Sequence, residues 1–523
     1  MSRQGSRFRR TQHLLACITT LLYAITPAPA WGQNLRFSPG EDAPVAFNPA
    51  TGSYEEGASF DPLACAEQPC IEVLHNIFEP LVSISNAQVI EPQLATRWER
   101  LSDVRFRFTL RRGVVFHNGE PFDAEATRFS LVRTSKTYGA TAWFPEIERV
   151  AVIDSHTVDV ILKDPDSLFL YRLAHIGLMH PPKYFQQVGE ASFGRKPIGT
   201  GAFQFVRWDG SRREIVLEAN PRYWRKGYPK VRSIVYAYMD GEQALDLLIQ
   251  GKLDLIRRLN PRKTTYFMQT GSGKIVKAWL PQLVLGPFNL LKSDTPLRDV
   301  RVRQAINLAI NRDDLIRYGV IGNGRLLAGY TVPDDPNHTG LQPYRLDVAR
   351  ARQLLEEAGH ASGLTLSVLV AKQVPPQIEN IIAVSLRQVG ITVQFKRVTE
   401  SEFLKEVYLP KFGAGAAPSF DILLFSMPAG TIFHSGNVPM TLLYSRKPNE
   451  SALRDPTVDQ LYEDALRTYD AGKASTLWKQ LEQNVHDRHL LFVGYQELAV
   501  FGAAHRLQFT PRTLMSFWDA SYE

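Results

Sequence analysis

Apolar and polar positions alternate with changing periods along the chain, and the clearest pattern lies between residues 104 and 136. From Val104 to Leu110 apolar side chains alternate with Arg and Thr, the two-residue period of a strand with one buried face. Gly113 ends this stretch, Val114–Phe116 predicts a second strand, and Asn118-Gly119 suits a tight turn. Asp123 is placed to cap a helix that follows. The pattern predicts a compact ββα unit.

Further along, strand-like and helix-like stretches alternate regularly. Thr399 and Glu402 have the spacing of a capping box, which predicts another helix start. The predicted order is helix 348–358, strand 364–370, helix 378–389, strand 391–398 and strand 420–425, with two amphipathic helices over 458–469 and 477–485. Strand 234–238, a helix ending at Gly251 and strand 253–256 repeat this order earlier in the chain. Such β-α-β alternation favours a largely parallel sheet covered on both faces.

The ββα unit also carries an ordered set of motifs. They are Leu94, Ala95 and Trp98, then Phe108–Arg111, Val114–Gly119 and Pro121–Ala124. This order resembles the pattern of solute-binding protein family 5, the extracytoplasmic receptors of ABC importers for peptides, nickel and related solutes. We expect these residues to form turns and cores without touching a ligand.

The resemblance implies an α/β fold of the periplasmic binding protein type: two hinge-connected lobes, type II-like, with an extra subdomain in the first lobe. We expect residues 31–285 to form the first lobe, with the subdomain inserted at about 83–195. Residues 286–490 would form the second lobe, and 491–523 would return to the first. The segment Pro197–Phe203 resembles the family's Gly-Thr-Gly-Pro segment, with Ala202 in place of the proline. Its glycines favour a tight turn over a ligand contact.

The N-terminus has the composition of a secretory signal. Arg3, Arg7, Arg9 and Arg10 precede a mostly apolar run over 14–25, and Ala28-Pro29-Ala30 fits the small-x-small cleavage rule. Residues 1–30 are therefore expected to be cleaved, leaving a soluble periplasmic protein that begins near Trp31. Cys17 lies in a lipoprotein-like box, but the apolar run follows it rather than precedes it.

Charge and hydropathy exclude other classes of protein. The 523 residues carry a net charge of +7, and removing the four arginines of the signal leaves 56 basic against 53 acidic residues, or +3. The remaining charge occurs in short pairs such as Arg111-Arg112 and Arg257-Arg258. We therefore expect no nucleic-acid partner, and the sequence after residue 30 shows no run of membrane-spanning length. We expect a monomer.

Cys65 and Cys70 are the cysteines left after signal removal. In an oxidising compartment they predict a short-loop disulfide. A zinc site is the alternative, but it needs four ligands, and His75 would supply only a third.

Catalytic motifs are missing from the sequence. There is no G-x-S-x-G and no H-E-x-x-H, and Gly271-Ser272-Gly273-Lys274 departs from a phosphate loop at Met268 and Ile275. We expect no enzyme, no catalytic residue, no metal and no cofactor; a secreted hydrolase remains the alternative class.

In the family's peptide binders, the segment after the strand at 420–425 bears an aspartate that pairs with the peptide's α-ammonium group. Here residues 426–434 contain no acid. We therefore expect a peptide-like solute without a free α-ammonium group, or a nickel chelate or opine-like conjugate, passed on to an ABC permease and ATPase. The expected ligand contacts are Trp143, Asn289, Ser426, Met427, Thr431 and His434. For Trp143 the alternative is packing at a subdomain seam, and for His434 a solvent-exposed loop position.

Overall fold

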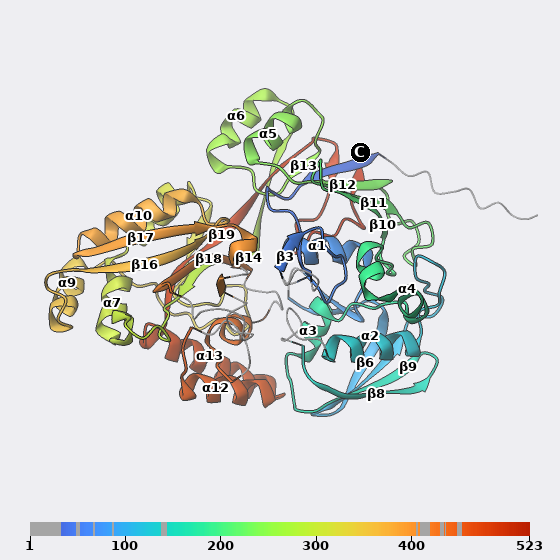
Figure 1. Ribbon diagram of the computed structural model, residues 1–523, viewed down its shortest axis with the longest axis horizontal. Helices are drawn as coiled ribbons and strands as arrows, with labels where there is room; N and C mark the ends of the chain where they lie inside the picture. The colour runs from blue at the N-terminus through green and yellow to red at the C-terminus, as the bar shows by residue number, and fades with distance from the viewer. Residues whose placement is uncertain are drawn as a thin grey trace, which may run out of the picture. The chain divides into compact units, whose positions relative to one another are not determined.

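The computed structural model describes residues 33–48, 53–65, 68–85, 88–136, 144–403, 406–407, 419–428, 434, 436–446 and 452–523. Within these ranges, eleven strands share one mixed sheet, ordered β10-β11-β12-β1-β13-β19-β14-β18-β16-β17, with β15 beside β19 (Figure 1). We call β10 to β13 with β1 the first half-sheet, and β16 to β18 the second half-sheet.

The first half-sheet has β1 at its centre. Its strands are β1 (Asn34–Ser38), β10 (Phe203–Asp209), β11 (Glu214–Ala219), β12 (Ser233–Ala237) and β13 (Leu255–Ile256). β1 runs parallel to both β12 and β13. One core joins this half-sheet to helix α1 (Gln68–Ile77) and the C-terminal segment, through Phe37, Val73, Tyr236, Phe501 and Phe517. A smaller core joins α5 (Gly241–Ile249) and α6 (Thr264–Thr270) to it.

A separate four-stranded antiparallel sheet, ordered β6-β7-β9-β8, packs with helix α2 (Ala124–Lys136). Its strands are β6 (Ala95–Ser102), β7 (Arg105–Leu110), β8 (Ile147–Asp154) and β9 (Thr157–Leu162). The strand predicted at 104–110 and the helix after Asp123 are confirmed, and the Asp123 carboxylate accepts the Ala126 N–H at 3.0 Å.

The strand predicted at Val114–Phe116 is wrong. Val115 forms only an isolated bridge to Pro121, and the Phe116 N–H donates to the carbonyl of Glu120. The strands that pair with β7 are β6 and β9 instead. Turn residues around Asn118 fold this short apolar stretch back on itself, so its apolar side chains pack as a loop.

The second half-sheet consists of β16 (Leu364–Ala371), β17 (Ile391–Val398) and β18 (Ile422–Pro428), with β16 parallel to both neighbours. These match the predicted strands closely. Helices α7 (Val300–Ala309), α9 (Val348–Glu357) and α10 (Pro376–Arg387) pack into one core with it, through Val302, Ile306, Leu354, Val368 and Ile382. The capping box is also present, since Thr399 N–H donates to Glu402 Oε2 at 2.8 Å at the start of α11 (Glu400–Phe403).

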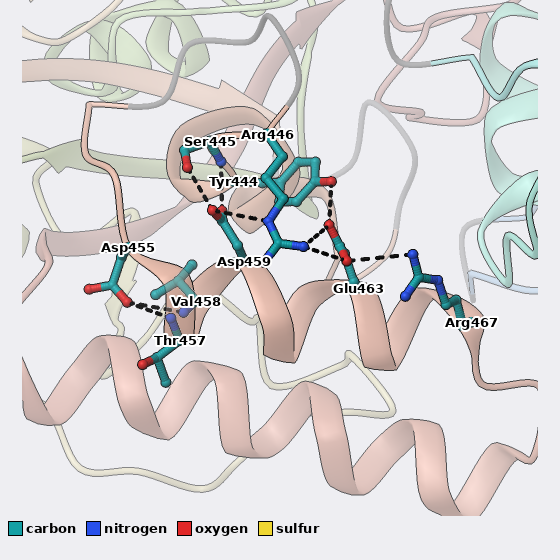
Figure 2. Close-up of polar contacts among 9 residues, drawn as sticks. All are labelled: Tyr444, Ser445, Arg446, Asp455, Thr457, Val458, Asp459, Glu463 and Arg467. Carbon is teal, nitrogen blue, oxygen red and sulfur yellow. Dashed lines mark hydrogen bonds and ion pairs between the residues drawn. The ribbon is translucent and has the colours of Figure 1, made fainter.

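A second core includes Leu369, Phe425 and Met427 of this half-sheet together with α12 (Pro456–Arg467) and α13 (Ala471–Asp487). Figure 2 shows how the chain before α12 is held to that helix. Arg446 donates to Glu463 at 2.9 Å, the Tyr444 hydroxyl donates to the same carboxylate at 2.8 Å, and Ser445 donates to Asp459.

Two long strands join the half-sheets. β14 (Lys274–Pro287) and β19 (Leu491–Ala503) pair antiparallel; β19 also pairs with β13, and β14 with β18. The chain therefore passes between the half-sheets along β14 and β19. The lobe boundaries at residues 285 and 490 and the subdomain limits stay predictions.

Shorter elements complete the part of the chain that the structure describes. They are β2 (Val45–Asn48), β3 (Ser53–Glu56), β4 (Val82–Ile84), β5 (Ile90–Pro92), α3 (Phe169–Ile176), α4 (Pro182–Arg195), α8 (Arg312–Asp314), β15 (Gly324–Leu326), β20 (Leu507–Gln508) and β21 (Ser521–Tyr522). The glycine segment predicted as a turn lies against α1: a Cβ on Gly199 would come within 2.1 Å of the Ile77 carbonyl oxygen.

Candidate functional site

The carboxyl ends of the parallel strands in both half-sheets meet at one crevice. A cavity of about 310 Å³ is lined by Glu41 and Asp42, which follow β1, and by Lys372 and Thr399, which follow β16 and β17. Open α/β sheets bind ligands in the crevice outside the carboxyl ends of their strands. This cavity is therefore the first candidate for a site.

A second cavity, of about 390 Å³, is lined by Gln373, the residue that follows Lys372 in the chain. Its walls include Gln373 after β16, Arg257 and Arg258 after β13, and Gln282 of the joining strand β14. The two cavities thus share the end of β16, and we call them together the strand-end crevice.

Most charged groups of the crevice are already paired. The ammonium of Lys372 lies 2.8 Å from Glu41, with both side chains well exposed, so this ion pair contributes little stability. Arg257 is buried and paired with Glu72. Burial dominates the shift that raises the pKa of Glu72 to about 7, and the Arg257 guanidinium opposes it.

Asp42 is different, because its carboxylate has no hydrogen-bond or ion-pair partner among the residues that the structure describes. Burial raises its pKa, while the more distant charges of Lys372 and Arg258 act in the opposite direction. A half-buried carboxylate without a donor is under-solvated. An incoming ammonium or N–H group would satisfy it.

Arg258 is the matching cation. It lines the second cavity, and within the described ranges no carboxylate or hydrogen-bond acceptor contacts its guanidinium. Its side chain is exposed, and its charge acts on that of Asp42. Glu497 lines the same cavity and is a second carboxylate without an ion pair among the described residues, so the crevice holds unpaired charges of both signs. That arrangement suits a zwitterion.

Ser426 is close to the crevice. It lies near the carboxyl end of β18, and its hydroxyl accepts a hydrogen bond of 2.8 Å from Gln282, which lines the second cavity. Met427, the next residue on the strand, belongs to the core with α12 and α13 and is 5% exposed. Because neighbouring strand residues face opposite ways, these two side chains do not lie on one face.

Asn289 lies at the other end of β18. Its side-chain amide donates to the Phe420 carbonyl at 2.8 Å, and its backbone N–H donates to Asp421. The four strand steps from Ile422 to Ser426 span roughly 13 Å, so the structure does not bring Asn289 to Ser426. It ties β14 to the start of β18.

His434 lies between helices rather than in the crevice. Its ring packs against Tyr171 of α3 at 5.0 Å and Trp478 of α13 at 5.4 Å between ring centres. Burial lowers the pKa of His434 to about 3, and the nearby Arg172 charge adds to the effect. The Gly436 N–H donates to Nδ1, so the neutral ring carries its proton on Nε2. Trp143 and Thr431 lie outside the described residues.

The α3 helix contacts α12 through a paired, buried network. Arg172 lies 2.9 Å from Asp166 and donates to the Tyr462 hydroxyl at 2.9 Å, and the Ser167 N–H donates to the Leu466 carbonyl. The Arg172 and Asp166 side chains are each only 4% exposed. Both charges are therefore held by one another away from water.

Comparison with known proteins identifies the class of this crevice. Residues 89–446 match the bacterial extracellular solute-binding proteins, family 5. The chain belongs to this family. Its members are binding proteins of ABC transporters and not enzymes.

Three similar proteins illustrate the family. The glutathione-binding protein GsiB of Pectobacterium atrosepticum is 26% identical over 491 residues, covering 88% of this chain and 91% of that protein. The periplasmic binding protein DppA from Helicobacter pylori, in complex with the peptide STSA, gives a TM-score of 0.81 at 20% identity, covering 94% of this chain and 98% of that one. AgaA from A.tumefacien R10, in complex with agropinic acid, gives 0.79 at 20% identity, covering 94% and 99%. The two structures establish the α/β fold.

Cys65 and Cys70 are joined in a disulfide, with Cα atoms 5.8 Å apart. Among the described helices, none has the length and apolar character to cross a membrane. The same ranges contain no cluster of three or more His, Cys, Asp or Glu side chains able to hold a metal.

Sequence reasoning missed Asp42 and treated Arg257-Arg258 only as a scattered basic pair. A usable signal was present for the arginines, because they follow directly on the short buried strand β13, whereas Asp42 lies four residues after the end of β1. In a parallel sheet, polar residues at such positions line the ligand crevice.

Proposed function

We propose that this family 5 protein is the periplasmic receptor of an ABC importer and that it captures a small peptide-like zwitterion in the strand-end crevice. The observation that carries the proposal is the pair of charged groups without partners, Asp42 and Arg258. Asp42 would receive the ammonium group of the solute and Arg258 its carboxylate. A captured solute would then be passed, by the monomeric receptor, to a permease and ATPase at the inner membrane.

The proposal revises the expectation of a solute without an ammonium group. That expectation rested on the lack of an acid in residues 426–434. Asp42 provides a carboxylate from the first half-sheet, and burial without a donor makes it a strong acceptor. One similar protein is named for binding glutathione and another is in complex with a tetrapeptide. Both of these ligands carry an ammonium group and a carboxylate, which supports this class of solute.

Calorimetric titration tests the proposal. The panel contains glutathione, di- to pentapeptides, their N-acetylated and C-amidated forms, an opine, and nickel with and without histidine. We expect peptides with free termini to bind most tightly. Tight binding of nickel-histidine or the opine, with none of the peptides, would overturn the solute class and favour the chelate or conjugate receptors.

Variants locate the contacts. Asp42→Asn is expected to lower the affinity for peptides with a free amine by roughly 10- to 100-fold, because a lost charged hydrogen bond costs about 1.5–3 kcal/mol. The affinity for N-acetylated peptides should be unaffected. Glu41→Gln is the matched control, because Glu41 lines the same cavity and is already paired with Lys372. Trp143→Ala, Thr431→Ala and His434→Ala test the remaining expected contacts. Wild-type affinity in all of these variants would show that the solute binds elsewhere in the protein.

Export is tested separately. The mature protein purified from periplasm is expected to begin near Trp31. A mature chain starting at acylated Cys17 would instead make it a lipid-anchored receptor.

A further inference from the structure

A third cavity lies away from the strand-end crevice, within the part of the chain that contains the first half-sheet. It has a volume of about 350 Å³ and lies among the end of α1, the hairpin of β4 and β5, the end of α3, and residues 510–518. Nothing in the proposed solute capture uses it. Its polar lining nevertheless contains groups that need a partner.

His175 of α3 is the first of these groups. Its side chain is 1% exposed, it lines the cavity, and neither ring nitrogen has a hydrogen-bond partner among the described residues. Its backbone carbonyl is occupied, since it lies 2.8 Å from the Nε2 of His75. Burial keeps the pKa of His175 well below its ordinary value, so the ring is neutral, with one donor and one acceptor unsatisfied.

Arg225 is the second group. Its guanidinium lies 4.5 Å from the ring centre of Trp224 and 4.5 Å from that of Trp518, and one terminal nitrogen donates to Gln93 Oε1. Its buried Nε has no acceptor within the described ranges, and no carboxylate there forms an ion pair with it. The stacked rings hold this donor in place, which lowers the entropy lost when an acceptor binds.

The other charged groups of the lining are already satisfied or lie at its edge. Glu79 accepts hydrogen bonds from Gln93, Thr200, Tyr223 and Trp224. Arg512 is paired with Asp519 at 2.6 Å, and Glu91 is exposed on β5. Arg225 is thus the charge left without a direct counter-ion. Phe78, Ile84 and Leu514 form an apolar part of the wall, and hydroxyl side chains such as Ser83, Ser85 and Thr510 line the remainder.

We propose that this cavity is a second binding site, which takes a small monocarboxylate with an apolar body. The carboxylate oxygens would accept from Arg225 Nε and from the N–H of His175, and the apolar part would lie against the hydrophobic wall. A guanidinium binds a carboxylate more strongly than a neutral acceptor, because the hydrogen bonds are charge-assisted. The site is independent of Asp42 and Arg258, so its test does not depend on the identity of the imported solute.

The probe is 4-bromobenzoate, whose bromine can be located by anomalous diffraction, with 4-bromobenzamide as its neutral counterpart. We expect one bromine position inside this cavity and at least a tenfold preference for the carboxylate in calorimetry. A bromine found only in the strand-end crevice, equal binding of the amide, or a cavity holding only water would overturn the proposal.

Variants make the assignment specific. Arg225→Gln is expected to lower the affinity for 4-bromobenzoate at least tenfold. Arg111→Gln is the matched control, because Arg111 also stacks on Trp224, at 4.0 Å, but does not line the cavity. Ala174→Met fills the cavity without removing a charge and should also abolish binding, so the test stands even where Arg225→Gln fails to fold. Asp42→Asn should leave this binding unchanged, and unaltered binding in Arg225→Gln and Ala174→Met would refute the site.

Discussion

The chain makes two long-range contacts of opposite chemical character. At the contact between α3 and α12, Arg172 is paired with Asp166 and donates to Tyr462 away from water, and of its nitrogens only Nε lacks a partner among the described residues. At the strand-end crevice, Asp42 and Arg258 remain without partners within the described ranges, beside an exposed ion pair. Paired groups stabilise a structure, whereas unpaired groups retain interaction energy for a ligand. Ligand binding is therefore expected where charged side chains lack partners.

The largest effect on stability is expected from a substitution that breaks the paired contact between α3 and α12. Arg172→Ala leaves Asp166 buried without its counter-charge, and we expect the free energy of unfolding to fall by about 3–5 kcal/mol. Urea unfolding measures it. The control is Arg128→Ala, which removes an exposed pair with Glu125 and should cost under about 1 kcal/mol. Equal effects of the two variants would show that the α3 contact is not a stabilising network.

The disulfide crosslink has the next largest expected effect. Replacing Cys65 and Cys70 by serine together should lower the free energy of unfolding by about 2 kcal/mol, at the low end of the usual range because the loop is short. Affinity for the solute should stay constant. Free thiols in protein purified from an oxidising compartment would contradict the pairing.

Acid should weaken the α3 contact selectively. The pKa of His434 is about 3 in the folded protein, and an unfolded chain titrates it near 6.5. Between these values only the unfolded chain binds the proton, so stability is complete above pH 6.5 and falls as the pH decreases. Burial lowers the pKa of His75, His117, His180 and His489 as well, and these contribute the same sign.

The His434 share is isolated by difference. Going from pH 7.5 to 5.5 should destabilise the wild type by about 1.4 kcal/mol more than His434→Gln. Denaturant unfolding at both pH values measures this difference. Identical pH dependence in the two proteins would mean that the His434 side chain is exposed to water, which is the alternative stated for this residue from the sequence.

The smallest effect on stability is expected in the crevice. Asp42→Asn removes an under-solvated carboxylate that makes no hydrogen bond, so the free energy of unfolding should stay within about 0.5 kcal/mol of wild type. Thermal and urea unfolding check this value. A loss as large as that in Arg172→Ala would mean that Asp42 is a structural residue, and the contrast between the two contacts would fail.

Local sequence patterns predicted most of the second half-sheet. Strand 391–398 has the predicted bounds, and the capping box at Thr399 is present as predicted. They could be predicted because each signal lies within one or two turns of chain. Val114–Phe116 failed because three apolar residues suit a strand and a packed loop equally well, and only the neighbouring strands decide between them.

The predicted ligand contacts lie in different places in the structure. Ser426 is close to the crevice, but Asn289 lies at the far end of β18 and Met427 faces the core. A strand has two faces and two ends, and the segment in which a residue lies specifies neither its face nor its end.

By itself the sequence determined the family, the succession of strands and helices, and the absence of an acid in residues 426–434, because all of these are local or ordered along the chain. Only the tertiary structure decided that Asp42 lies near Arg258 and Lys372, more than two hundred residues away in sequence. It also decided which charges found partners. Pairing depends on long-range packing of β1, β13 and β16, and hydrophobic periodicity carries no information about which polar side chains that packing leaves unsatisfied.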